Sequence, residues 1–154
     1  DETLVDADEL HAAWLGFNTK DDVHVDVIAF GSPHASLKEI LKLAELVEDR
    51  RKASSVRVVV TLAQSTLDRV KEVGGESLFR LDAFGVEFIV DTCWCMLTDR
   101  VHVPKDANIL TNSAKYAHYA GGLVQPNSAS FAGMEDCVRA AVSGRFVRTR
   151  PKWL

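Results

Sequence analysis

Short apolar runs alternate along the chain with amphipathic segments. Four runs are rich in β-branched residues and lack polar alternation, which is typical of strands buried on both faces: 25–30, 56–62, 86–90 and 107–110. Apolar residues recur at helical spacing in six segments that we expect to be helices: 6–17, 36–50, 64–73, 76–84, 113–119 and 134–142. A weaker strand is expected within residues 123–131.

Local signals set several helix ends. Residues 6–9 and 36–39 carry the capping-box pattern, in which an Asp or Ser is followed three residues later by Glu. Gly85 is expected to end the helix over 76–84, because glycine readily adopts the left-handed conformation of a helix C-terminus. We expect Gly121-Gly122 to end the helix over 113–119.

This alternation predicts the fold class. Strands that alternate with helices favour a three-layer α/β/α domain around a mainly parallel sheet of four to five strands, with right-handed crossovers. No composition shift or repeat divides the chain, so we expect one α/β domain over residues 1–154. A flavodoxin-like or response-regulator-like domain is disfavoured, because neither the acidic cluster nor the phosphate loop of those proteins is evident.

Composition and charge narrow the function classes. The net charge of -4 gives no reason to expect nucleic acid as the main partner, and the basic residues at 145–152 are expected to form a solvated tail or linker. Neither a signal peptide nor a membrane-spanning run is evident, and three cysteines make no disulfide framework, so we expect a cytoplasmic protein. Because the chain opens at Asp1 without Met, we expect it to be a piece of a larger protein.

The candidate chemistry lies where strands end. Because parallel strands share one carboxyl edge, the junctions at 31–34, 63–65, 91–93 and 111–115 are expected to converge there. Together they supply a thiol, an imidazole, hydroxyls, an amide and an ammonium, and helix N-termini add N–H groups suited to phosphate or carboxylate.

Each of these groups also has an ordinary interpretation. Cys93 could reach a metal, but Cys93 and Cys95 could equally pack as small hydrophobic residues. Lys115 opposes the helix dipole, which indicates a nearby anion unless the side chain simply extends into solvent. His34 alone is typical of a helix start or a surface, and Cys137 is expected in the core.

Three strand-end motifs, in this order and spacing, resemble the aconitase X family. They are GSPH at 31–34, DTC at 91–93 and TNSAKYAHY at 111–119, and the resemblance extends over about residues 25–146. It implies that the chain is the C-terminal domain of that family's large subunit. The missing parts implied by the resemblance are the rest of the large subunit and a small swivelling domain or subunit.

The resemblance also implies an activity. Members of the family are hydro-lyases that dehydrate small hydroxy acids, such as cis-3-hydroxy-L-proline or mevalonate 5-phosphate, with an iron–sulfur cluster. By this resemblance Cys93 is a cluster ligand, and Ser32 stands at a possible ligand position where a cysteine is expected. Ser113 and Lys115 are implied as catalytic residues, while the substrate-binding residues are His34, Asn112 and His118.

Two functions therefore stay open. The first is part of an aconitase X-type hydro-lyase, expected to be inactive as an isolated domain because it lacks the other parts. The alternative is a non-catalytic α/β module that binds an anionic small molecule or a partner subunit. Ser32 in place of a cysteine and the short length favour the alternative.

Overall fold

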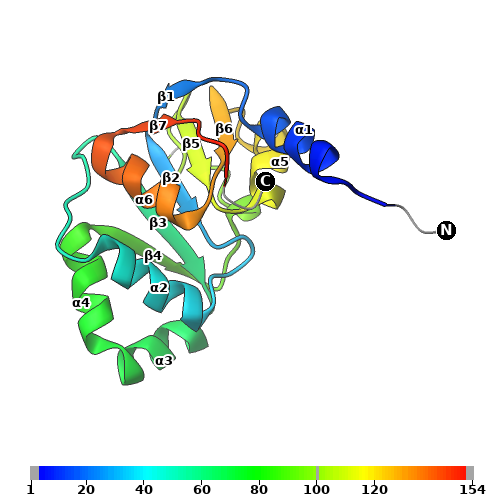
Figure 1. Ribbon diagram of the computed structural model, residues 1–154. Coiled ribbons are helices and arrows are strands. Elements are labelled where there is room, and N and C mark those ends of the chain that lie inside the picture. Colours follow the sequence, from blue (N-terminus) through cyan, green and yellow to red (C-terminus); the bar gives the residue numbers. More distant parts are fainter. Residues whose placement is uncertain (1–3, 100, 152–154) are drawn as a thin grey trace.

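A five-stranded parallel sheet forms the centre of the computed structural model, which describes residues 4–99 and 101–151. The strand order is β4-β3-β2-β5-β6, and every neighbouring pair is parallel. The central strand β2 pairs Ile28 with Val58 on one side and with Leu110 on the other. The sheet (Figure 1) consists of β2 (Val27–Phe30), β3 (Arg57–Leu62), β4 (Val86–Val90), β5 (Asn108–Thr111) and β6 (Ser128–Phe131).

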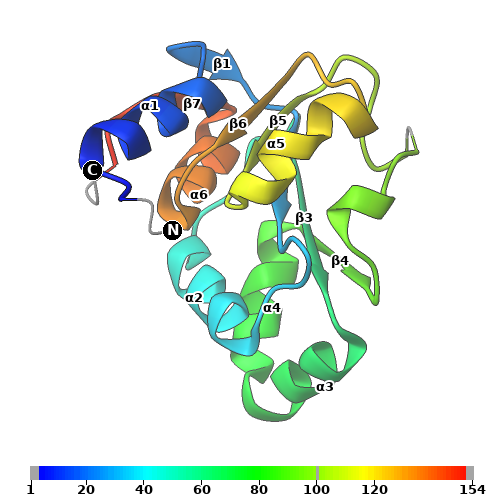
Figure 2. The same cartoon turned by 90° about the vertical axis from the view of Figure 1, so that its right-hand side faces the viewer.

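Helices cover both faces of this sheet, as Figure 2 shows. One face packs against α2 (Leu37–Val47), α3 (Gln64–Val73), α4 (Gly75–Phe84) and α6 (Met134–Ser143). The other face packs against α5 (Ala114–Leu123) and the 3₁₀ helix η1 (Trp94–Met96). The first helix, α1 (Ala7–Phe17), lies beside β6 and α5. The three-layer fold predicted from the sequence is thus confirmed.

The β-branched runs explain why helices must cover both faces of the sheet. Successive residues of a strand point to opposite faces, so Ile28 joins the core under α2 and α6 while Val27 and Ala29 join the core under α5. All four residues of β2 are buried. Strands of this kind cannot leave either face in water, which is why they lack polar alternation.

The predicted helix starts are confirmed, and one predicted end is wrong. Asp6 and Ser36 each accept a hydrogen bond from the backbone N–H three residues later, and both capping boxes are complete. Gly85 ends α4 with φ +85°. However, α5 continues through Gly121-Gly122 to Leu123. Glycine keeps its N–H group, and its helix penalty of about 1 kcal/mol is too small to end a helix by itself.

The C-terminal basic segment is not a solvated tail over its first residues. Arg145–Val147 forms β7, which pairs antiparallel with β1 (Asp22–His24). Phe146 is only 4% exposed, and Arg145 Nη2 lies 2.7 Å from Asp22 Oδ2. The prediction failed because the strand partner lies more than 120 residues away in sequence. Residues 152–154 of this segment lie outside the described residues.

None of the described helices has the length and apolar character needed to cross a membrane.

Candidate functional site

The chain reverses its direction of winding between β2 and β5. After β2 the chain turns to α2 on one face, and after β5 it turns to α5 on the other face. In open α/β sheets such a switch point leaves a crevice at the carboxyl ends of the two strands, where ligands bind. Here the two loops touch, because Ser113 Oγ donates a hydrogen bond of 3.4 Å to the Ser32 carbonyl oxygen.

A third loop reaches the same place from the edge of the sheet. The segment after β4 passes into η1, and Cys93 Sγ lies 3.6 Å from Ser32 Oγ. Lys115 Nζ, in the first turn of α5, lies 3.9 Å from the same sulfur. We call Ser32, Cys93, Ser113 and Lys115 the strand-end cluster. The structure therefore brings together four of the seven site residues named from the sequence.

Three buried side chains hold the loop that carries Ser32. Thr61 Oγ1 on β3 donates to the Gly31 carbonyl and lies 3.1 Å from the Pro33 carbonyl oxygen. Trp94 Nε1 donates to the Phe30 carbonyl at 2.9 Å, and Thr111 Oγ1 on β5 donates to the Ala29 carbonyl at 2.7 Å. None of the three was given a role from the sequence, although Thr111 opens the TNSAKYAHY motif and Trp94 lies between two cysteines.

Gly31 is required where the loop begins. Its φ of +76° lies in the left-handed region, and an added Cβ would overlap the Thr61 carbonyl oxygen. The same Cβ would lie 2.7 Å from the backbone nitrogen of Ala35, which bonds to the Thr61 carbonyl. The loop therefore passes against the β3 backbone with no room for a side chain.

The environment of the strand-end cluster favours a thiolate at Cys93. Burial raises the pKa of this thiol, but hydrogen bonds from its surroundings and the Lys115 charge more than offset that effect, so the pKa lies below its ordinary value. The donors are the Cys95 backbone N–H, the Ser32 hydroxyl and the Cys95 thiol. The pKa of Cys95 is raised instead, first by burial and then by the charge on Cys93. Both cysteines are half-buried, whereas Cys137 is fully buried as predicted.

Tyr116 packs against Trp94, the residue between the two cysteines. Its side chain is fully buried and its ring centroid is 5.3 Å from that of Trp94. Burial raises the pKa of the phenol, and charges on Cys95 and Cys93 raise it further, so the group stays protonated. The phenol oxygen has no hydrogen-bond partner among the described residues. Tyr116 falls within the TNSAKYAHY motif, but sequence alone gave no reason to single it out.

Ser113 has a structural role in this arrangement. It is the N-cap of α5, where its Oγ accepts a hydrogen bond of 3.3 Å from the Tyr116 backbone N–H. Its own backbone N–H donates to Thr111 Oγ1 at 3.1 Å. The predicted catalytic role of Ser113 stays a prediction.

The three predicted substrate-binding residues lie outside these contacts. His34 is exposed and Asn112 is half-buried, and no described residue hydrogen-bonds to either side chain. His118 is exposed and stacks edge-on against Tyr119, with ring centroids 4.9 Å apart. It lines a hollow of about 390 Å³ whose other described residues lie on α1, α5 and β6. Their predicted roles are therefore not supported by any contact with the strand-end cluster.

The side chains of the strand-end cluster fit part of the ligand set of a metal centre bound by thiolates. Cys93 supplies a thiol with a lowered pKa, and the Ser32 hydroxyl lies 3.6 Å from its sulfur. Within residues 4–99 and 101–151, no three His, Cys, Asp or Glu side chains are grouped to hold one metal ion.

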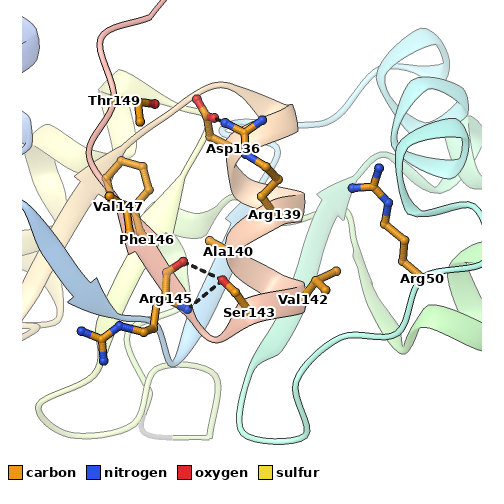
Figure 3. A pocket seen from close by; sticks show the side chains of 10 residues that line it. All are labelled: Arg50, Asp136, Arg139, Ala140, Val142, Ser143, Arg145, Phe146, Val147 and Thr149. Carbon is orange, nitrogen blue, oxygen red and sulfur yellow. Dashed lines mark hydrogen bonds and ion pairs between the residues drawn. The ribbon is translucent and has the colours of Figure 1, made fainter.

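A different hollow lies between α6 and β7. It measures about 370 Å³ and contains the basic side chains Arg50, Arg139 and Arg145. Figure 3 shows that Arg139 is paired with Asp136, and that Arg145 points away from the other two arginines. None of the described residues that line it belongs to the strand-end cluster. We therefore place the candidate site at the switch point and not in this hollow.

Sequence comparison relates the chain to known proteins. A sequence profile described as the aconitase X third domain matches residues 25–143. Cis-3-hydroxy-L-proline dehydratases from Pseudomonas aeruginosa and Hypocrea jecorina are each 39% identical to the chain, over 150 and 151 residues. These alignments cover 97% of this chain but only 25% of each relative, so the chain spans about a quarter of their length.

A solved structure supports the fold independently. The holo-form of aconitase X from Thermococcus kodakaraensis superposes with a TM-score of 0.72 at 22% sequence identity. The match covers 89% of this chain and 33% of that one. At this identity the likeness establishes the fold alone. The family itself follows from the profile match, and the chain belongs to the aconitase X family, with the third domain of that family as its matching part.

Proposed function

We propose that this chain is part of a hydro-lyase that removes water from a small hydroxy acid. Family membership supports this reaction class, and the observation that carries it is the meeting of Ser32, Cys93 and Lys115 at the switch point of the sheet. The names of the two dehydratase relatives suggest cis-3-hydroxy-L-proline as the first substrate to test.

The proposed role of Lys115 is to bind the acidic group of the substrate. Its ammonium lies in the first turn of α5, where the backbone N–H groups also favour an anion. The elimination takes a proton from one carbon and hydroxide from its neighbour, leaving a double bond and water. We propose Lys115 and Ser113 as the catalytic residues, and His34, Asn112 and His118 as substrate-binding residues in the assembled enzyme.

We further propose that the complete enzyme contains an iron–sulfur cluster. Cys93 would be one ligand, and Ser32 lies at a possible ligand position 3.6 Å from it. The remaining ligands would come from the rest of the large subunit, and a small swivelling domain or subunit would close the site. When bound, an iron with an open coordination position supplies Lewis acidity toward the leaving hydroxyl. Three free cysteines favour a reducing compartment, and we propose the cytoplasm.

The test uses the complete enzyme that contains this chain. Dehydration of cis-3-hydroxy-L-proline and iron content are measured for the wild type and for Cys93→Ala and Lys115→Met. We expect Cys93→Ala to lose iron and turnover, and Lys115→Met to lose turnover while keeping iron. Lys38→Met is the control, because Lys38 occupies the equivalent second position of α2. Unchanged iron content in Cys93→Ala would contradict the ligand assignment.

The alternative is a non-catalytic module that binds an anionic small molecule or a partner subunit. Ser32, at a position where the resemblance implies a cysteine ligand, favours it. If the wild-type enzyme binds phosphate or a carboxylate but holds no iron after anaerobic reconstitution, this alternative replaces the hydro-lyase. A stoichiometric cluster together with turnover would exclude it.

A further inference from the structure

Cys93 lies on a short loop that is fixed at both ends. Trp94, the next residue, is fully buried, and its indole N–H donates to the Phe30 carbonyl at 2.9 Å. Asp91 lies two residues before Cys93, with only Thr92 between them. The position of Cys93 therefore depends on Trp94 on one side and on the contacts of Asp91 on the other.

Asp91 is bound to the N-terminus of α3. Its Oδ1 accepts a hydrogen bond of 2.9 Å from the Gln64 backbone N–H, and its own backbone N–H donates to the Leu62 carbonyl at 2.9 Å. The φ of Asp91 is +54°, in the left-handed region that Asp and Asn adopt more readily than most other residues. Asp91 thus turns the chain out of β4 and links that turn to α3.

The cap of α3 comes from a distant residue. Helix N-termini are commonly capped by the side chain of their own N-cap residue, as Asp6 caps α1 and Ser36 caps α2. The N-cap of α3 is Ala63, which makes no such bond. The acceptor instead belongs to Asp91, 27 positions after Gln64. A serine at position 63 could cap the helix without restricting the Cys93 loop, whereas the observed bond restricts both.

We propose that Asp91 is a positioning residue, which keeps the Cys93 sulfur beside Ser32 and Lys115 through its bond to α3. The sulfur lies 3.6 Å from Ser32 Oγ and 3.9 Å from Lys115 Nζ, and both partners belong to other segments of the chain. A misplacement of about 1 Å is enough to reduce catalysis by about 100-fold. The catalytic consequence rests on the proposed function, in which Cys93 is a ligand. Asp91 is not assigned any contact with substrate or metal.

The first test measures the placement of Cys93 in the complete enzyme without metal. The parent protein carries Ser32→Cys, which supplies a second thiol beside Cys93, and Cys95→Ala, which removes a competing one. Equilibration with glutathione gives the effective concentration of the introduced thiol toward Cys93, and mass spectrometry identifies the disulfide. Asp91→Ala should lower this effective concentration about tenfold or more. Asp91→Asn should retain it, because Asn can accept the same bond and tolerates the left-handed backbone.

Two further variants separate positioning from helix capping. Asp6→Ala removes the N-cap bond of α1, which is also 2.9 Å long, and should lower the denaturation midpoint while leaving the effective concentration unchanged. Ala63→Ser, added to Asp91→Ala, gives α3 a cap of its own. It should raise the denaturation midpoint of Asp91→Ala while the effective concentration stays low. This double variant also serves for the measurement if Asp91→Ala alone does not fold.

The second test uses the enzyme that retains Ser32 and Cys95, loaded with iron. Asp91→Ala should lower kcat for cis-3-hydroxy-L-proline about 10–100-fold with a smaller change in KM, and Asp91→Asn should restore most of the loss. Ala63→Ser should not restore kcat to Asp91→Ala, because a cap on α3 does not place Cys93.

The outcomes separate this proposal from the function on which it rests. If Asp91→Ala leaves the effective concentration unchanged, or if Ala63→Ser restores it, Asp91 acts only as a helix cap and the proposal is wrong. A parent protein that forms no disulfide with Cys93 would also overturn it. If the wild-type enzyme holds no iron and does not dehydrate the substrate, the proposed function fails, while the metal-free measurement still decides the role of Asp91.

Discussion

Lys115 Nζ lies 3.9 Å from Cys93 Sγ, so the cation in the first turn of α5 faces the thiol that follows β4. A lysine at this position opposes the helix dipole, and the sequence therefore indicated a nearby anion. The structure places the Cys93 thiol beside this lysine, and the Lys115 charge is one of the causes that lower the pKa of that thiol. The two residues form one electrostatic unit even though they come from opposite sides of β2 and β3.

Removing the lysine charge should make Cys93 a weaker nucleophile. In Lys115→Met we expect the pKa of Cys93 to rise toward its ordinary value, because a Coulombic stabilisation of the thiolate is lost. The rate of iodoacetamide alkylation at Cys93, followed by mass spectrometry across pH, measures this change. Lys115→Arg should retain the low pKa and Lys38→Met should leave it untouched; equal alkylation profiles for Lys115→Met and wild type would refute the coupling.

Thr61 should contribute to stability well beyond its size. Its buried hydroxyl bonds to the Gly31 carbonyl and lies within hydrogen-bond distance of the Pro33 carbonyl. Thr61→Val keeps the shape but leaves these acceptors without their donor, which should destabilise the protein by about 1–3 kcal/mol. Urea denaturation measures the effect. Thr19→Val, at an exposed position, should change stability by no more than about 0.5 kcal/mol.

Gly31→Ala should be among the most damaging single-methyl additions in the chain. Because the backbone is left-handed here and a Cβ would overlap the Thr61 carbonyl oxygen, we expect the free energy of unfolding to fall by about 2–5 kcal/mol. Gly16→Ala provides the opposite case, because Gly16 lies within α1 and an added Cβ there would meet no atom within 4 Å. The free energy of unfolding of Gly16→Ala should rise by about 0.5–1 kcal/mol. Thermal denaturation of both variants checks the sign as well as the size.

The helix starts, the buried strands and the convergence of the strand ends could be predicted because each depends on a local signal or on a general rule of parallel sheets. The capping boxes at Asp6 and Ser36 depend only on residues three apart, and the β-branched run of β3 is itself the evidence of burial. The meeting of Ser32, Cys93 and Lys115 could be expected because parallel strands share one carboxyl edge.

The features that the sequence could not predict depend on contacts between residues far apart in the chain. The pairing of β1 with β7 joins residues 22–24 to residues 145–147, and neither three-residue strand has a periodic signal of its own. Asn18 is fully buried because its side chain bonds to both the N–H and the carbonyl of Phe131 at the edge of β6. The unpartnered hydroxyl of Tyr116 likewise depends on packing, since its residue type alone indicates no such environment.

The C-terminal strand should therefore be essential to stability. Phe146 packs in the same core as α6, so Phe146→Ala should cost about 3–5 kcal/mol through lost burial and the cavity left behind. Val147, the next residue of β7, is 58% exposed, and Val147→Ala should change stability by no more than about 0.5 kcal/mol. Equal urea midpoints for the two variants would mean that β7 is a dispensable tail after all.

Stability should also depend on the charge state of Cys93. Its pKa is lowered in the folded protein, so the folded state binds fewer protons than the unfolded state between the two pKa values. The resulting stabilisation is fully present above the ordinary pKa of the unfolded thiol and is lost as pH falls through the lower folded pKa. In the metal-free protein, the urea midpoint of wild type relative to Cys93→Ala should therefore rise with pH across this window. A difference that stays constant with pH would show that the Cys93 thiol is not stabilised as a thiolate, and that Lys115 acts on something else.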